Sequence, residues 1–441
     1  MSIAFRHGPD RQPAQPSCAI VNPAGENECA KGKWFFLCAF IFSCFQFWWL
    51  PSLLFRTVVH QTDEIENTTI VISILAMICF IAGYLFPAFG RRPTQYSEPV
   101  LAACGNLSYR AAVLLAIPAL ILAIQFWRTH QSMTYGYMAI VPIPFEYQVV
   151  LYTHLFFGFM YLGSADPGRD GWRRILIAST LVILPRLIIS LHWGRFFVAQ
   201  AMIPALLIAI ARGWIQISPR RLLQIALLAL GLIFVPPLTR GDFSGEQKDI
   251  VAWLSGGSSL RLMQSDNDLN LNGYCNPFLV SLTSKSIPYR LLGACVLDMG
   301  SQKGMPAPLD RILTINLPYN YNGVISGTGS NYLLELYLLG GLAGVYAGSV
   351  LFGFTCRLFM RWIGMRSLFS GIWAACLTRA LLAPRGNLSY VFEQIPPLVL
   401  ATFVVVLIVW AGRLLNKESA ASREAQASVP ALKMVPICAI E

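Results

Sequence analysis

The chemistry open to this sequence depends on arginines at the ends of long apolar runs. Arginine supplies 26 of the 33 basic residues, and its planar guanidinium can hold phosphate oxygens with two hydrogen bonds at once. Four arginines lie near the ends that we assign to the non-cytoplasmic side: Arg186, Arg195, Arg379 and Arg385. Such a charge is costly unless it meets an anion or reaches the interface. Any one could be an interfacial anchor, but Arg186 and Arg195 together favour an anion-binding site.

Two side chains could take up a proton in such a site. Glu335 lies about one turn into an apolar run, after a glycine-rich turn that ends at Ser330. Its carboxylate should therefore face the interior of a helix bundle, as a general base or as one half of a structural ion pair with an arginine. His192 lies between Arg186 and Arg195 and could carry a proton, although a single interfacial histidine is more often structural.

Several classes of function lack support in the sequence. There is no Walker loop and no glycine pattern of a dinucleotide-binding fold, and no Cys/His or Asp-x-Asp spacing of a metal site. We therefore expect chemistry without nucleotide, metal or other cofactor. The net charge of +11 is spread in small clusters, which argues against nucleic acid as a partner. Cys275 and Cys295 could form a disulfide or remain two separate thiols.

Ten apolar runs must position these residues. The chain has 441 residues, of which 55% are hydrophobic and 12% charged, about half the charge of a soluble domain. Hydrocarbon offers no partner to backbone amides, so each run should be a helix. The runs are Trp34–Phe55, Ile70–Phe89, Ala111–Trp127, Tyr147–Leu162, Ile175–Leu191, Phe196–Ala211, Leu222–Leu238, Tyr332–Cys356, Leu368–Ala383 and Val391–Gly412. The sequence predicts an all-α polytopic membrane protein with about ten transmembrane helices.

The connecting segments predict which side each run faces. Alternate segments, including both termini, hold 20 of the 33 Lys and Arg residues. The first segment of the other set, Arg56–Thr69, has three acidic residues and one arginine. Because basic segments stay inside, both termini should be cytoplasmic.

This arrangement predicts five parts along the chain. The segment 239–330, on the side away from the cytoplasm, is polar and long enough to form a binding surface or a lid. The parts are a disordered cytoplasmic tail (1–33), transmembrane helices 1–7 (34–238), a large external loop (239–330), transmembrane helices 8–10 (331–412) and a second cytoplasmic tail (413–441).

Three segments carry a resemblance to a known family. Gly327–Val345, GTGSNYLLELYLLGGLAGV, resembles the signature around the helix after the large periplasmic loop in bacterial O-antigen and exopolysaccharide repeat-unit polymerases of the Wzy type. Arg385–Ser389 is similar to the Arg-Gly-Ser-like stretch before their final helices. His192–Arg195 resembles their Ser-x-Arg region, with His-Trp-Gly in place of a Ser/Gly-rich form. The architecture agrees over about residues 34–412.

The resemblance implies a multi-pass protein of the bacterial inner membrane that joins undecaprenyl-diphosphate-linked oligosaccharide repeat units at the periplasmic face. It implies that Glu335 or His192 accepts the proton of the attacking hydroxyl. The arginines implied to hold the leaving diphosphate are Arg186, Arg195, Arg379 and Arg385, and the residues implied to contact glycan are Tyr319, Tyr321 and Ser330. Further implied partners are the lipid bilayer, a chain-length regulator and a flippase.

Two other functions fit the same pattern. An O-antigen ligase-like glycosyltransferase also has a large periplasmic loop. A lipid-linked glycan flippase or transporter would need charged residues along several helices and usually an internal repeat. Here the intramembrane charges gather near one face and no repeat is visible, which favours a site at the surface of the membrane.

Overall fold

The computed structural model describes residues 23–49, 64–87, 98–130, 145–191, 196–215, 224, 320–321, 324–325, 332–385, 388–392, 395, 399 and 402–412. Most of these residues are helical, as predicted. The helices are α1 (Pro23–Cys44), the π-helix η1 (Phe45–Trp49), α3 (Glu64–Leu85), α4 (Glu98–His130), α5 (Phe145–Ser164), α6 (Pro167–Asp170), α7 (Trp172–Ser190), α8 (Phe196–Ala211), α16 (Tyr332–Ile363), α17 (Ser370–Leu382), the 3-10 helix η5 (Ala383–Arg385) and α18 (Ser389–Phe392). Two short strands, β1 (Asn320–Tyr321) and β2 (Val324–Ile325), pair antiparallel.

The predicted boundaries differ from the observed ones at several helix ends. α1 begins at Pro23, so residues 23–33 are helical. The prediction of a disordered tail over residues 1–33 does not hold for these residues. Proline is favourable in a first helical turn, where its missing N–H has no partner to lose. α4 and α16 also extend beyond their apolar runs. All of the predicted run Leu222–Leu238 except residue 224, and most of segment 239–330, lie outside the described residues.

The composition of the helices is that of a membrane protein. Within the described part of the chain, Glu98–Thr129 and Gly340–Ile363 are each long and apolar enough to cross a bilayer, and six shorter apolar helices accompany them. Large apolar side chains are exposed on the outside of the bundle, among them Leu114, Leu351 and Phe403. Exposed apolar surface of this extent needs a nonaqueous environment or a partner.

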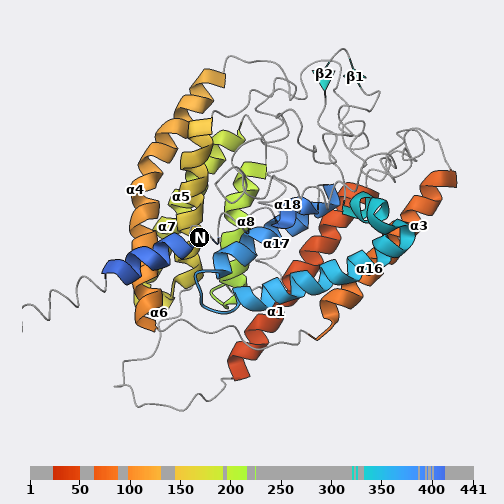
Figure 1. Cartoon of the computed structure of the whole chain (residues 1–441), viewed down its shortest axis with the longest axis horizontal. Helices are drawn as coiled ribbons and strands as arrows, with labels where there is room; N and C mark the ends of the chain where they lie inside the picture. The colour runs from red at the N-terminus through yellow and green to blue at the C-terminus, as the bar shows by residue number, and fades with distance from the viewer. Residues whose placement is uncertain are drawn as a thin grey trace, which may run out of the picture.

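The helices form two groups that α1 and α17 connect. Figure 1 shows α4, α5, α7 and α8 side by side in one group and α3 against α16 in the other, and α1 contacts α8 as well as α3 and α16. α17 contacts α5 and α8 in the first group and α16 in the second. This arrangement brings the C-terminal part of the chain against helices from its first half.

Arg212 fastens one end of the bundle. It directly follows α8, and its guanidinium donates five hydrogen bonds of 2.6–3.3 Å to backbone carbonyl oxygens. The acceptors belong to the ends of α5 and α16: Leu162, Gly163, Ala165, Ile363 and Met365. The last carbonyls of a helix lack partners within it, and a positive charge is favourable there. One side chain therefore joins the ends of three helices.

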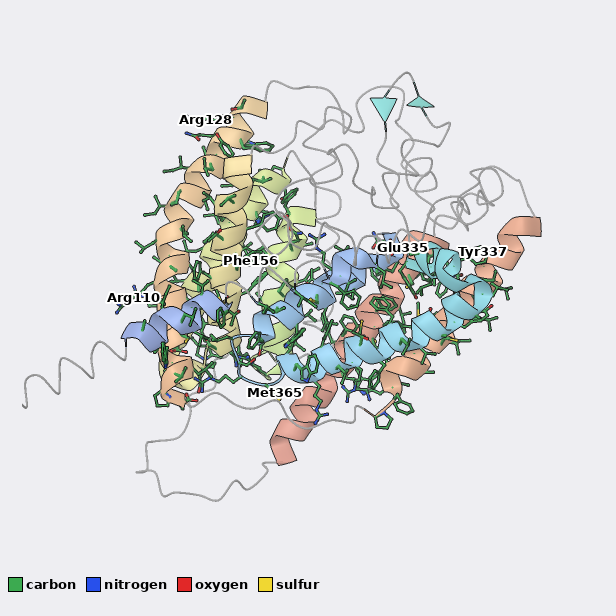
Figure 2. The ribbon with its side chains drawn as sticks, viewed as in Figure 1. Arg110, Arg128, Phe156, Glu335, Tyr337 and Met365 are labelled. Carbon is green, nitrogen blue, oxygen red and sulfur yellow. The ribbon has the colours of Figure 1, made fainter. Side chains whose placement is uncertain are left out.

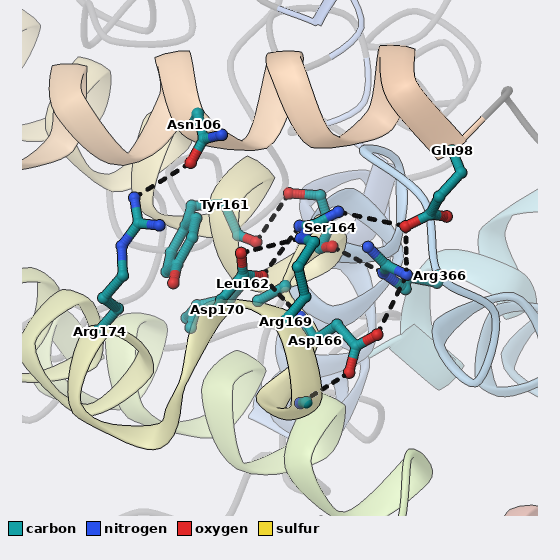
Figure 3. Close-up of polar contacts among 12 residues, drawn as sticks. Glu98, Asn106, Tyr161, Leu162, Ser164, Asp166, Arg169, Asp170, Arg174 and Arg366 are labelled. Carbon is teal, nitrogen blue, oxygen red and sulfur yellow. Dashed lines mark hydrogen bonds and ion pairs between the residues drawn. The ribbon is translucent and has the colours of Figure 1, made fainter. Parts of the chain in front are cut away.

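Charged residues pair beside Arg212 (Figure 3). Arg366 contacts Glu98 at 2.8 Å and Asp166 at 3.3 Å, and Arg169 contacts Glu98 at 3.2 Å. Burial raises the pKa of Asp170, but hydrogen bonds from Arg169 and from the Asp166 backbone outweigh it and hold that pKa below its ordinary value. The helix ends that the sequence assigns to one side thus lie together.

Glycines allow α3 and α16 to pack at short range. A Cβ on Gly83 would collide with the backbone of Val350, and one on Gly353 would collide with the backbone of Phe80. Small residues at helix contacts are how membrane helices approach closely, because lipid provides no hydrophobic force between them. The main part of α16 is therefore fixed against α3.

The first prediction concerns Arg212. In Arg212→Met, buried carbonyls at the ends of two helices lose their donors, so we expect a loss of about 3–5 kcal/mol of stability. Thermal unfolding of the purified protein in detergent measures the change. Arg110→Met removes an exposed arginine of α4 and should have little effect. Equal melting temperatures for both variants would show that Arg212 does not hold the helix ends together.

Candidate functional site

A break in α16 sets the geometry of the site. Gly340 has φ −163° and ψ 28°, and Gly341 has φ 59° and ψ −148°. The sequence predicted one uninterrupted run here, but these angles divide it into a short segment, 332–339, and a long helix, 342–363. The conformation of Gly341 is one that residues with a side chain rarely adopt.

Glu335 lies buried in the short segment. Its carboxylate is 2% exposed, as predicted for an intramembrane acid that faces the bundle. It accepts a hydrogen bond from the backbone N–H of Leu388, which follows η5. Figure 2 shows Glu335 at the junction of the short segment with the end of α17. Two segments far apart in the sequence therefore meet at this carboxylate.

Contacts with α1 and η1 hold these segments in place. Ser43 donates a hydrogen bond to the carbonyl of Leu381, and Trp48 donates one of 2.8 Å to the carbonyl of Pro384. The Trp48 ring also lies 5.6 Å from that of Tyr332, at the start of the short segment. The backbone groups at the end of α17 thus have partners within the bundle.

Two of the predicted arginines belong to this end of α17. Arg379 lies in its last turn, and Arg385 ends η5, three residues before Leu388. The structure thus brings the backbone that carries Arg385 next to Glu335.

Arg186 is buried in α7, one turn before the helix ends, and is 1% exposed. Its guanidinium carbon lies 4.6 Å from the ring centre of Tyr152 on α5 and 5.6 Å from that of Phe197 on α8. Arg379 on α17 is close enough for the two positive charges to interact. The structure therefore brings together two of the four predicted arginines, from helices on different sides of α8.

The remaining predicted site residues fall outside this description. His192, Arg195, Tyr319 and Ser330 are not among the described residues, and Tyr321 is described only by its backbone in β1. Their predicted roles therefore remain predictions.

The sequence interpretation missed His154. This residue of α5 is 2% exposed and interacts electrostatically with Arg186. The signal was present, because an ionisable residue within an apolar run is by default a candidate for function. His154 was overlooked because the apolar run Tyr147–Leu162 contains no second charged group that would have marked it.

A comparison with known protein families finds a match in the part of the chain that carries Glu335 and the end of α17. Residues 310–419 match the family model for O-antigen polysaccharide polymerase Wzy. The match confirms the resemblance noted from the sequence, and it includes Glu335, Arg379 and Arg385. It supports polymerisation of O-antigen repeat units in general, by an integral membrane protein. No curated protein and no solved structure matches the chain.

The second prediction tests the break in α16. Gly341→Ala forces a side chain onto a backbone with φ 59°, so we expect a cost of about 1–3 kcal/mol and a displaced Glu335 segment. Gly340→Ala is the matched control, since its φ of −163° suits any residue and an added Cβ meets no atom within 4 Å. Thermal unfolding and glycan chain length should change in the first variant only. Equal behaviour of the two would mean that the conformation at Gly341 does not matter.

Proposed function

We propose that this protein polymerises undecaprenyl-diphosphate-linked oligosaccharide repeat units at the periplasmic face of the inner membrane, as a metal-independent glycosyltransferase. One observation carries the proposal. The segment that matches the Wzy family contains the buried Glu335 and the helix end with Arg379 and Arg385. The segment thus combines a buried carboxylate and cations, the groups that transfer of a sugar from a diphosphate requires.

The proposed reaction transfers the growing glycan to the next repeat unit. A hydroxyl oxygen of the acceptor sugar attacks the anomeric carbon of the donor sugar, and the bond from that carbon to the diphosphate oxygen breaks. The hydroxyl proton passes to the Glu335 carboxylate. The lipid diphosphate leaves with the electron pair of the broken bond.

Arginines stabilise the departing negative charge in this proposal. Arg186 and Arg379 lie near each other despite their like charges, and an anion between them would relieve the repulsion. Arg385 is on the segment that contacts Glu335 through Leu388. Fixed cations in a site of low dielectric stabilise charge that develops in the transition state. Arg195 is proposed as a fourth cation of this group.

The other proposed roles come from the resemblance. His192 is an alternative proton acceptor, and Tyr319, Tyr321 and Ser330 contact the glycan chain. A chain-length regulator and a flippase are proposed as protein partners. The reaction needs no sugar nucleotide, because the donor sugar is already activated by its diphosphate.

The third prediction separates a catalytic from a structural Glu335. In Glu335→Gln the amide oxygen can still accept the Leu388 hydrogen bond, but it cannot take a proton. We expect a normal protein level and polymerisation lower by about 10²–10⁴-fold. Glu98→Gln, an exposed carboxyl at the other end of the bundle, should leave polymerisation unchanged. Chains of normal length in Glu335→Gln would make this residue a structural hydrogen-bond acceptor.

The fourth prediction separates polymerisation from ligation and transport. In a deletion strain, we expect surface glycan that is still exported but carries one repeat unit. Gel electrophoresis of the extracted glycan shows this as a single short band in place of a ladder. Loss of all surface glycan would instead indicate a flippase or a ligase. Restoration of the ladder by the wild-type gene, but not by Glu335→Gln, links the phenotype to the site.

A further inference from the structure

The burial of Arg186 has little compensation among the residues that the structure describes, where Tyr152 is the side chain that interacts favourably with its charge. Both terminal nitrogens, Nη1 and Nη2, lack a hydrogen-bond partner there, although the side chain is 1% exposed. The guanidinium also forms no ion pair with a described carboxylate. A buried charge of this kind is strongly unfavourable unless another group satisfies it.

The surroundings of the guanidinium determine where a partner can bind. Tyr152 and Phe197 contribute rings at 4.6 and 5.6 Å from its central carbon. Aromatic contacts of this type use the face of the guanidinium and leave the N–H groups at its edge available. Donors at one edge suit an anion with two oxygens, such as a phosphate.

His154 provides a second donor in the same region. It lies on α5, the helix that also carries Tyr152, is 2% exposed, and its Nε2 has no hydrogen-bond partner among the described residues. It also interacts electrostatically with Arg186. A neutral imidazole with its proton on Nε2 donates one hydrogen bond. Arg186 and His154, on neighbouring helices, therefore each have buried nitrogens without a hydrogen-bond partner among the described residues, and they lie within electrostatic range of each other.

We propose that Arg186 and His154 form a binding subsite for a phosphate anion between α5, α7 and α8, helices that contact one another. Arg186 binds the anion through N–H groups at its edge, and His154 donates through Nε2–H. The identity of the anion as the substrate's diphosphate rests on the proposed function. The headgroup of an anionic phospholipid offers the same phosphate chemistry.

The stability of the ligand-free protein distinguishes a binding arginine from a structural one. Loss of a structural arginine would destabilise the fold, whereas Arg186→Met removes a buried charge that forms no ion pair with a described carboxylate. We therefore expect the melting temperature of Arg186→Met, in zwitterionic detergent without phosphate, to equal or exceed that of the wild type. Arg174→Met is the matched control: Arg174 lies on the same helix, 4.4 Å from the Tyr109 ring, and donates to Asn106 at 3.1 Å.

Binding to the full-length protein in phosphatidylcholine nanodiscs tests the ligand, with geranylgeranyl diphosphate as the probe and geranylgeraniol as the phosphate-free control. We expect Arg186→Met and His154→Leu each to raise the Kd about tenfold or more. His154→Gln, which keeps a donor, should bind more tightly than His154→Leu, and Arg174→Met should match the wild type. The diphosphate should raise the melting temperature of the wild type but not of Arg186→Met.

Each outcome decides a separate point. Unchanged affinity in Arg186→Met and His154→Leu, or a lower ligand-free melting temperature in Arg186→Met, would overturn the subsite. Competition by phosphatidylglycerol at equal strength would support the phosphate site with a lipid headgroup as its source. Binding that depends on both residues in a protein whose deletion leaves glycan chain length intact would retain the subsite and reject the proposed function. Normal binding in both variants, together with single-repeat glycan in the deletion strain, would reject the subsite and retain the proposed function.

Discussion

The bundle depends on hydrogen-bond donors for the buried backbone carbonyls at its helix ends. The guanidinium of Arg212 supplies such donors. The hydrocarbon core of a membrane offers no water as a donor, and at these helix ends a side chain takes that role. Arg212 serves the ends of α5 and α16 from its position after α8. The helices could not end at this common level if their carbonyls were left without partners. Ion pairs of Glu98 with Arg169 and Arg366 add further connections between the same helix ends.

At the opposite end of the bundle, side chains again form hydrogen bonds with backbone groups, but some buried side-chain donors have no described partner. Ser43 and Trp48 serve carbonyls near the end of α17, and Glu335 serves the N–H of Leu388. Arg186 and His154, however, keep donor groups without partners among the described residues. Both ends hold buried side-chain atoms without a partner among the described residues, but Arg366 at the first end pairs with carboxylates, whereas Arg186 at the second end forms no ion pair with a described carboxylate. The proposed chemistry belongs to this second end for that reason.

Sequence reasoning identified those features that depend on the local pattern of residue types. Apolar runs identified the helices, basic segments identified which helix ends lie together, and the position of Glu335 in its run indicated burial. The break at Gly340 and Gly341 was not predicted, because a Gly-Gly pair in an apolar run also suits close helix packing. The contacts of Arg186 with the rings of Tyr152 and Phe197 depend on how three helices pack, and no spacing in the sequence encodes them. His192 and Arg195 lie outside the described residues, so their part in the site remains a prediction.

The glycine contacts between α3 and α16 restrict how the Glu335 segment can move. Gly83 and Gly353 allow backbone contact between the two helices, so sliding or rotation of the long part of α16 would create collisions. The short segment 332–339 is separated from that part by the break at Gly340 and Gly341, but it also packs back against it, with the Tyr332 ring 5.2 Å from that of Phe352. The close contact between α3 and α16 therefore also fixes the support on which the Glu335 segment rests. A glycan that grows at this carboxylate would have to move past it, because the carboxylate is held in one place.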